Sequence, residues 1–229
     1  MPAPLLCAGS PPLLTRPSDI IAELPLPQSQ ILTYEYKMPY PNLSLAVQHG
    51  FDTRVVNSYH AQLYLRKRLN EIHQLLYDPK KRNIPLHSQP PDEDNIINRL
   101  QENLDMSFVP SEFAFDPEEA PATEILSARL RAKYWGAQAI TFRPFVKQIL
   151  DFNSDRSAGN IGDLSYRAFG GQFSGPIIGP DVKHESDINP MILHYARKGI
   201  QALIESTRAF HNLEDKRFVI TNVFGTAHA

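Results

Sequence analysis

The chain has 229 residues, of which 42% are hydrophobic and 21% charged, and its 23 basic and 25 acidic residues give a net charge of -2. These values are typical of a globular protein with its own core, and they provide no basic footprint for DNA or for an anionic membrane surface. Cys7 is the only cysteine, which excludes an internal disulfide and a zinc site built from several thiolates.

No signal peptide or membrane span is predicted. The opening "MPAPLLCAGSPPLL" lacks a basic region and contains prolines, and no later apolar run approaches the roughly 18 residues of a membrane-spanning helix. We therefore expect a chain that is neither secreted nor inserted into a membrane.

Residues 1–54 are expected to form a loosely ordered lead-in, because they hold many prolines and little periodicity. Segments such as "ELPLPQSQ" and "MPYPNLSL" are interpreted as extended chain or turns. From Val55 to Tyr77 the pattern predicts the first helix, which we expect to end before Pro79. Apolar residues recur there at steps of three and four, namely Ala61, Leu65, Leu69, Ile72 and Leu76.

Basic residues interrupt this stripe in "LRKR" (65–68), and a second basic cluster, "PKKR" (79–82), follows the helix. The first is interpreted as a solvated helix face. The second is either a charged turn or a minimal nuclear import patch. Lys67 and Glu71, four residues apart, are expected to form an ordinary surface ion pair.

A shorter stripe after Asp92, ending near Leu104, suggests a second helix capped by that aspartate. The major helix is expected to start at Thr123. Its broad apolar arc indicates a central position, and it is formed by Ile125, Leu126, Leu130, Tyr134, Trp135, Ala137, Ala139, Thr141 and Phe142.

Arg143 and Pro144 interrupt this major stripe. A proline in a helix interior removes one amide donor and crowds the carbonyl four residues back, at a cost of about 3 kcal/mol. A proline at this position therefore requires a structural reason.

Residues 151–189 hold six of the eleven glycines and no stripe, which predicts a long flexible connection. Asn189 and Pro190 then predict a capped helix that runs to about Phe210. Its expected inner face consists of Ile192, Tyr195, Ala196, Gly199, Leu203 and Phe210. The last stretch, 217–229, has strand propensity but no partner strand, so we predict a helix there.

Catalytic motifs are scarce in this sequence. "GGQFSG" places Ser174 one residue late for a nucleophile elbow, and a hydrolase that uses Ser174 with an unplaced histidine is the alternative enzyme hypothesis. The eight histidines show no metal-ligand spacing. Isolated histidines such as His60 and His194 are interpreted as structural, and the carboxylates at 92–94 and 116–119 as solvated loop charge. We predict no catalytic, cofactor or metal residue.

The segment "ITFRPF" (140–145) is similar to the L-L-L-H-R-P-F-L motif of the middle homology region in fungal zinc-cluster transcription factors. Arg143, Pro144 and Phe145 match that motif, whereas Thr and Phe stand where the family usually has Leu and His. The resemblance extends over most of residues 55–150 and again over 190–229. Upstream, "LDMSFVPSEFAF" resembles the family's next pattern through Leu104, Phe108, Pro110, Phe113 and Phe115.

This resemblance implies an all-α regulatory domain: an irregular multi-helix array with long loops over residues 55–229. It implies a nuclear protein that controls transcription through contacts with other regions of the regulator or with protein partners, and an effector ligand that the motif does not identify. The residues expected to matter are structural, namely Tyr134, Trp135, Arg143, Pro144 and Phe145. The resemblance also implies that Pro144 begins a new helix at a corner between two packed helices, where Phe145 packs inward and Arg143 holds the corner.

The chain also departs from the family. The family's DNA-binding module holds zinc with six cysteines, whereas Cys7 stands alone here. We therefore expect no zinc and no direct DNA contact from this chain, and we expect a domain that is truncated at both ends. A helical protein-interaction module without regulatory descent is the remaining alternative.

Overall fold

The computed structural model describes residues 42–77, 113, 120–157, 176–179 and 181–213. Within these ranges the chain forms helices and no strand, which confirms the predicted all-α class. The elements are α3 (Leu43–Gln48), α4 (Thr53–Tyr77), α6 (Ile125–Ser157), the short 3₁₀ helix η5 (Glu185–Asp187) and α7 (Pro190–Arg208).

Helix α3 lies inside the predicted lead-in. The Asn42 side chain accepts a hydrogen bond from the Leu45 amide at 3.0 Å and caps the first turn, as asparagine commonly does at a helix start. The extended interpretation of "MPYPNLSL" is therefore wrong from Leu43 onward. Gly50, with φ at 87°, then turns the chain toward α4.

Helix α4 confirms the predicted stripe, because Ala61, Leu65, Leu69, Ile72 and Leu76 are all buried. The solvated face expected for "LRKR" is wrong at Arg66, which is only 3% exposed. Arg66, Asn70 and His73 are all buried and recur at steps of four and three residues, so they form a second stripe beside the apolar one. The buried arc of α4 is thus wider than its apolar stripe.

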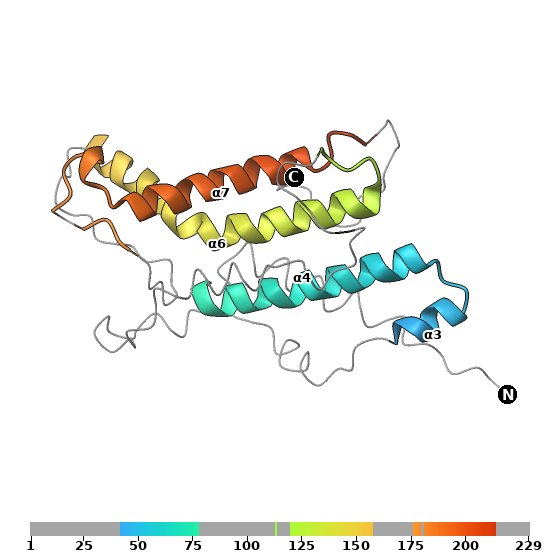
Figure 1. Ribbon diagram of the computed structural model, residues 1–229. Coiled ribbons are helices and arrows are strands. Elements are labelled where there is room, and N and C mark those ends of the chain that lie inside the picture. Colours follow the sequence, from blue (N-terminus) through green and yellow to red (C-terminus); the bar gives the residue numbers. More distant parts are fainter. Residues whose placement is uncertain (1–41, 78–112, 114–119, 158–175, 180, 214–229) are drawn as a thin grey trace.

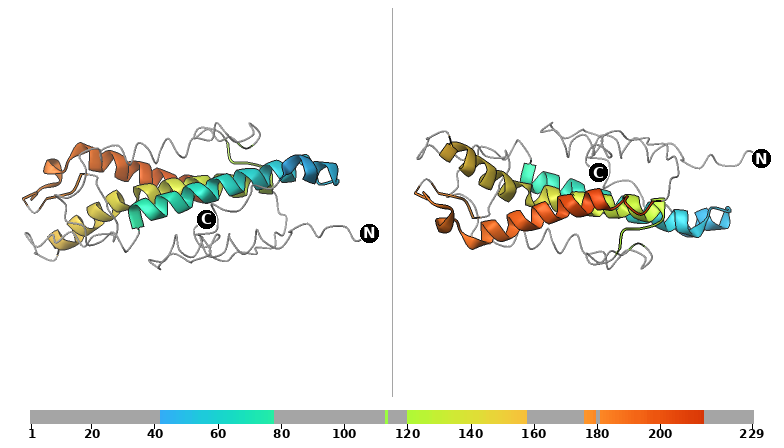
Figure 2. Two further views of the ribbon diagram at one scale, coloured as in Figure 1. Left: turned by 90° about the horizontal axis from the view of Figure 1, so that it is seen from below. Right: turned by 90° about the horizontal axis from the view of Figure 1, so that it is seen from above.

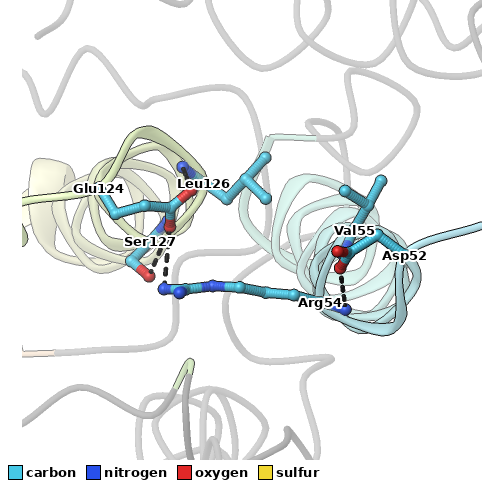
Figure 3. Close-up of polar contacts among 6 residues, drawn as sticks. All are labelled: Asp52, Arg54, Val55, Glu124, Leu126 and Ser127. Carbon is cyan, nitrogen blue, oxygen red and sulfur yellow. Dashed lines mark hydrogen bonds and ion pairs between the residues drawn. The ribbon is translucent and has the colours of Figure 1, made fainter.

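Two acidic side chains cap the adjacent starts of α4 and α6 (Figure 3). Asp52 accepts from the amides of Arg54 and Val55, and Glu124 accepts from the amides of Leu126 and Ser127 at 3.2 Å. Because Glu124 acts as the cap, α6 begins two residues after the predicted Thr123.

An ion pair joins these two helix starts. Arg54 Nη2 lies 3.1 Å from Glu124 Oε2, and both side chains are partly exposed. An exposed pair of this kind contributes little stability. Its position nevertheless shows that the first turns of α4 and α6 are neighbours, as Figure 3 illustrates.

Helix α6 lies between α4 and α7 (Figures 1 and 2). Helices α4 and α6 run in the same direction, whereas α7 runs back along α6. Phe113 also joins the core, beside the contact of α4 with the first half of α6. The largest buried cluster combines all three helices with the segment before α7: Leu69, Ile72, Leu76, Ala137, Phe142, Phe145, Phe152, Ile178, Ile188, Ile192, Tyr195 and Ala196.

The predicted helix boundary at Pro144 is wrong, because α6 runs without interruption from Ile125 to Ser157. The helix axis changes direction in its yellow part (Figures 1 and 2), as expected near a proline. The Thr141 hydroxyl also donates to the Ala137 carbonyl at 2.9 Å, a bond that favours bending.

Tertiary packing explains why the helix continues through this proline. Phe142 and Phe145 are 1% and 0% exposed, and burying each phenylalanine contributes about 1.5–3 kcal/mol. Together the two rings therefore offset the penalty of about 3 kcal/mol for an interior proline. Pro144 still destabilises the helix locally, but burial of the two phenylalanine rings against neighbouring helices exceeds this cost.

The predicted glycine-rich connection starts later than expected, because residues 151–157 belong to α6. Asn189 accepts from the Met191 amide at 2.9 Å and Pro190 opens α7, which confirms the predicted cap. Helix α7 ends at Arg208, slightly before the predicted Phe210.

The inner face of α7 is correctly predicted in its first half and wrong in its second half. Leu203 is exposed, whereas Ala202, Glu205 and Ser206 are buried. The buried face therefore moves around the helix as α7 crosses α6, which a fixed sequence period does not capture.

Several predicted features lie outside the described residues: "PKKR" (79–82), the helix at 92–104, the carboxylates at 92–94 and 116–119, residues 158–175 of the connection with Ser174, and the helix at 217–229. Within the described part, no helix is both long and apolar enough to cross a membrane.

Candidate functional site

The five residues of the predicted structural signature all lie on α6, in two separate groups. Tyr134 and Trp135 form an edge-to-face pair with ring centroids 5.2 Å apart. Arg143, Pro144 and Phe145 follow at a distance of about 13 Å along the helix axis. The structure therefore places the signature along one helix and does not bring it together as a single site.

Tyr134 connects different parts of the core. Its partly buried ring packs against the three-helix cluster, against the cluster beside Phe113 and against the contact between Trp135 and Ala202 of α7. Aromatic side chains supply large contact areas of this kind. Tyr134 and Trp135 thus act as packing residues where α4, α6 and α7 meet.

An aromatic cluster forms one end of the α6–α7 interface. Phe142 stacks on Tyr195 with ring centroids 5.6 Å apart, and Phe145 lies against the same ring at 4.8 Å. The Lys198 ammonium lies 5.8 Å from the centre of the Phe142 ring, within the range of a cation–π contact. Phe145 packs inward, as the family resemblance implies, whereas Arg143 is only half-buried.

Gly199 fixes how closely α7 approaches α6 beside this cluster. A Cβ atom at position 199 would lie 2.8 Å from Val146 Cγ2 and 3.1 Å from Phe142 Cβ. The second contact is severe because the Cβ of Phe142 cannot move away by a side-chain rotation. The absence of a side chain at Gly199 therefore allows the two helices to touch.

A buried ionic cluster forms the other end of the interface. The Arg131 and Glu205 side chains are each 3% exposed, and their charged atoms lie 3.9 Å apart. This distance is too long for a hydrogen bond. Arg131 instead donates to the Ala120 carbonyl at 2.9 Å, and Glu205 Oε1 accepts from Gln201 and Arg208 at 2.9 Å.

These contacts satisfy both buried charges, as buried ions require. Arg131 comes from the first half of α6, and Glu205 comes from the last turns of α7. Ser206 adds a hydrogen bond to the Ala132 carbonyl at 3.3 Å. The ionic cluster therefore fixes one register between the two helices.

Gln148 attaches the segment before α7 to α6. Its side-chain oxygen accepts from the Ile178 amide at 3.0 Å, and its nitrogen donates to the Pro176 carbonyl at 3.4 Å. This pair of bonds satisfies backbone groups of an otherwise irregular segment. It also holds Ile178 in the apolar core.

Arg131, Gln148 and Glu205 were not predicted from the sequence, and Gly199 was predicted on the inner face of its helix without the reason for a glycine there. One signal was available for Glu205, because it is the only acidic residue within 190–208 and stands among apolar neighbours. Arg131 and Gln148 gave no comparable signal, since a polar residue on a helix is usually exposed.

The candidate site is thus an interface between helices. Among the described residues, no group of three or more histidine, cysteine, aspartate or glutamate side chains could hold a metal ion. His194 packs against the Tyr195 ring at 5.4 Å. The arrangement can hold α6 and α7 in a fixed register, and it leaves one face of α7 exposed.

Comparison with protein-family models, curated proteins and solved structures gives no match for this chain. The resemblance to the fungal regulatory domain therefore remains a prediction that depends on the quoted motifs.

Proposed function

We propose that this chain is the helical regulatory region of a fungal transcription factor and that it acts in the nucleus through protein contacts. The Arg143–Pro144–Phe145 motif is the observation that carries the proposal. Its phenylalanine is fully buried against Tyr195 of α7, and its proline is also fully buried. The motif thus has the packing role that a regulatory helical scaffold requires.

The architecture supports the same function. A buried ionic cluster at one end and an aromatic cluster at the other hold α6 and α7 in one arrangement. A regulatory region must present partner surfaces in a fixed geometry. In this proposal the helices form the scaffold, and inhibitory contacts use its outer faces.

Tethering the chain to a promoter tests this function. The complete 229-residue chain would be fused to an unrelated DNA-binding domain and activation domain in a fungal cell carrying a reporter gene. We expect lower reporter output than with the same fusion lacking the chain, at equal protein levels on an immunoblot.

Two variants sharpen the test. Phe145→Ala, which removes a core ring, should relieve the inhibition, whereas Leu150→Ala, at a side chain 63% exposed, should leave it intact. Unchanged reporter output from the fused wild-type chain at equal protein levels would rule out the proposed regulatory role.

A further inference from the structure

The outer face of α7 carries an apolar strip that no described element covers. Ile200, Leu203 and Ile204 are 49%, 48% and 46% exposed, and their spacing of three and four residues places them on one side of the helix. Single exposed aliphatic residues are ordinary. Three adjacent ones on a helix whose opposite face is buried form a continuous surface.

Positive charge borders this strip, which we call the α7 strip. Helix α7 contains three basic residues, Arg197, Lys198 and Arg208, and one acidic residue, Glu205. Glu205 is buried in the ionic cluster, whereas Arg197 and Arg208 are exposed. At helical spacing both arginines lie beside Ile204 on the same flank of the strip. Arg208 already pairs with Glu205 at 2.9 Å, so Arg197 supplies the exposed positive charge that a partner would meet at this border.

We propose that the α7 strip is a docking surface for an amphipathic acidic helix of a partner protein. The partner's apolar side chains would cover Ile200, Leu203 and Ile204, and a carboxylate beside them would face Arg197. Anchors at steps of three and four residues are typical of helix recognition. Opposite charges at the border would set partner choice and association rate.

Two other occupants fit the charges less well. A second copy packed through the same strip would offer Arg197 no opposite charge, because Glu205, the one acidic residue of α7, is buried. Nucleic acid would gain phosphate contacts from the arginines but would leave the aliphatic centre uncompensated. The acidic helix matches both the centre and the border.

The proposal goes beyond the regulatory function, because it depends on α7 alone and holds for any helical interaction protein. The test uses the complete purified chain and two synthetic helical peptides with identical leucine anchors. One peptide carries glutamates beside the anchors, and the other carries lysines. We expect the glutamate peptide to bind and to weaken as salt increases, and the lysine peptide not to bind.

Charge reversal provides the decisive variant. Arg197→Glu should weaken binding of the glutamate peptide by about tenfold and strengthen binding of the lysine peptide. The reason is that the charge at position 197 determines whether an acidic or a basic peptide is attracted. Leu203→Ser should weaken binding of the glutamate peptide, because it removes an apolar contact at the centre of the strip. Met191→Ser, at a residue 50% exposed on α7 but outside the strip, is the matched control and should bind like the wild type.

Circular dichroism of each variant would establish that the helices are intact. Equal binding of the two peptides, binding of neither, or concentration-dependent dimerisation that Leu203→Ser abolishes would overturn the proposal. Reporter inhibition is measured separately, so loss of peptide binding with inhibition intact would reject the docking surface without rejecting the regulatory function.

Discussion

At one end of the α6–α7 interface, Phe142 and Phe145 pack on Tyr195, whereas at the other end Arg131 and Glu205 are buried as charged groups. The same two helices are thus joined by two kinds of chemistry. Apolar packing is nondirectional and stabilises through the area removed from water. Buried charges stabilise less, but they penalise every arrangement that separates them.

Because their chemistry differs, the two ends of the interface have different structural roles. The aromatic end, with the close approach at Gly199, sets the distance between the helices. The ionic end sets the register, because Arg131 and Glu205 face one another in only one alignment. Substitutions at each end should therefore differ in size and in how they can be rescued.

The largest effect is expected at the aromatic end. Phe145→Ala removes a ring that is 0% exposed, which should lower the free energy of unfolding by about 3–5 kcal/mol. Urea denaturation followed by circular dichroism measures this loss. Leu150→Ala is the control, since that side chain is 63% exposed and should change stability by less than about 0.5 kcal/mol. Similar losses for both would contradict the assignment of the core.

A somewhat smaller effect is expected at the ionic end. Glu205→Ala leaves the Arg131 charge buried without its counterion, which should cost about 3 kcal/mol. Replacing both residues, as Arg131→Met with Glu205→Leu, should recover most of that loss because no buried charge remains. A double variant as unstable as Glu205→Ala, again measured by urea denaturation, would show that the charges themselves stabilise the interface.

Replacing glycine by alanine should change stability in opposite directions at two positions of α6 and α7, because the helices approach each other closely at only one of them. Gly199→Ala should destabilise by about 1–3 kcal/mol because its Cβ would meet Phe142 and Val146. A Cβ at Gly136 in α6 would have no neighbour within 4 Å, so Gly136→Ala should stabilise by up to about 1 kcal/mol through helix propensity. Thermal unfolding compares the two, and stabilisation by both would show that α7 does not touch α6 at this point.

The smallest effect is a pH dependence from α4. Burial raises the pKa of the Tyr59 phenol above its usual value, so the folded state keeps this group neutral where the unfolded chain ionises it. The contribution of Tyr59 to the free energy of unfolding is therefore fully present below the ordinary tyrosine pKa of about 10. This contribution is lost as the pH rises further. Tyr59→Phe should reduce the fall in stability above that pH, and an identical fall in both proteins would remove Tyr59 as a cause.

Much of the fold was predictable from spacing alone. The stripe from Ala61 to Leu76 correctly indicated α4, and Asn189 with Pro190 correctly indicated the start of α7. These signals are local, because a helix places residues three and four apart on one face and a cap satisfies its first amides. They indicated a mostly helical chain, and the family resemblance implied the all-α class.

The candidate site was less predictable. The sequence pointed to Tyr134, Trp135 and the motif at 143–145, but it divided α6 at Pro144 and treated "LRKR" as solvated. Both errors concern residues whose local preference is opposed by their neighbours in space. Pro144 continues a helix between two buried phenylalanines, and Arg66 is 3% exposed within α4.

By itself the sequence determined α4, the first half of α6, and α7 with its cap, since those outcomes depend on contacts within a few residues. Only the tertiary structure decided which polar groups are buried, how α6 passes through Pro144 and which side of α7 remains exposed. The reason is that burial is a property of two surfaces in contact. One helix cannot specify what its neighbour will cover.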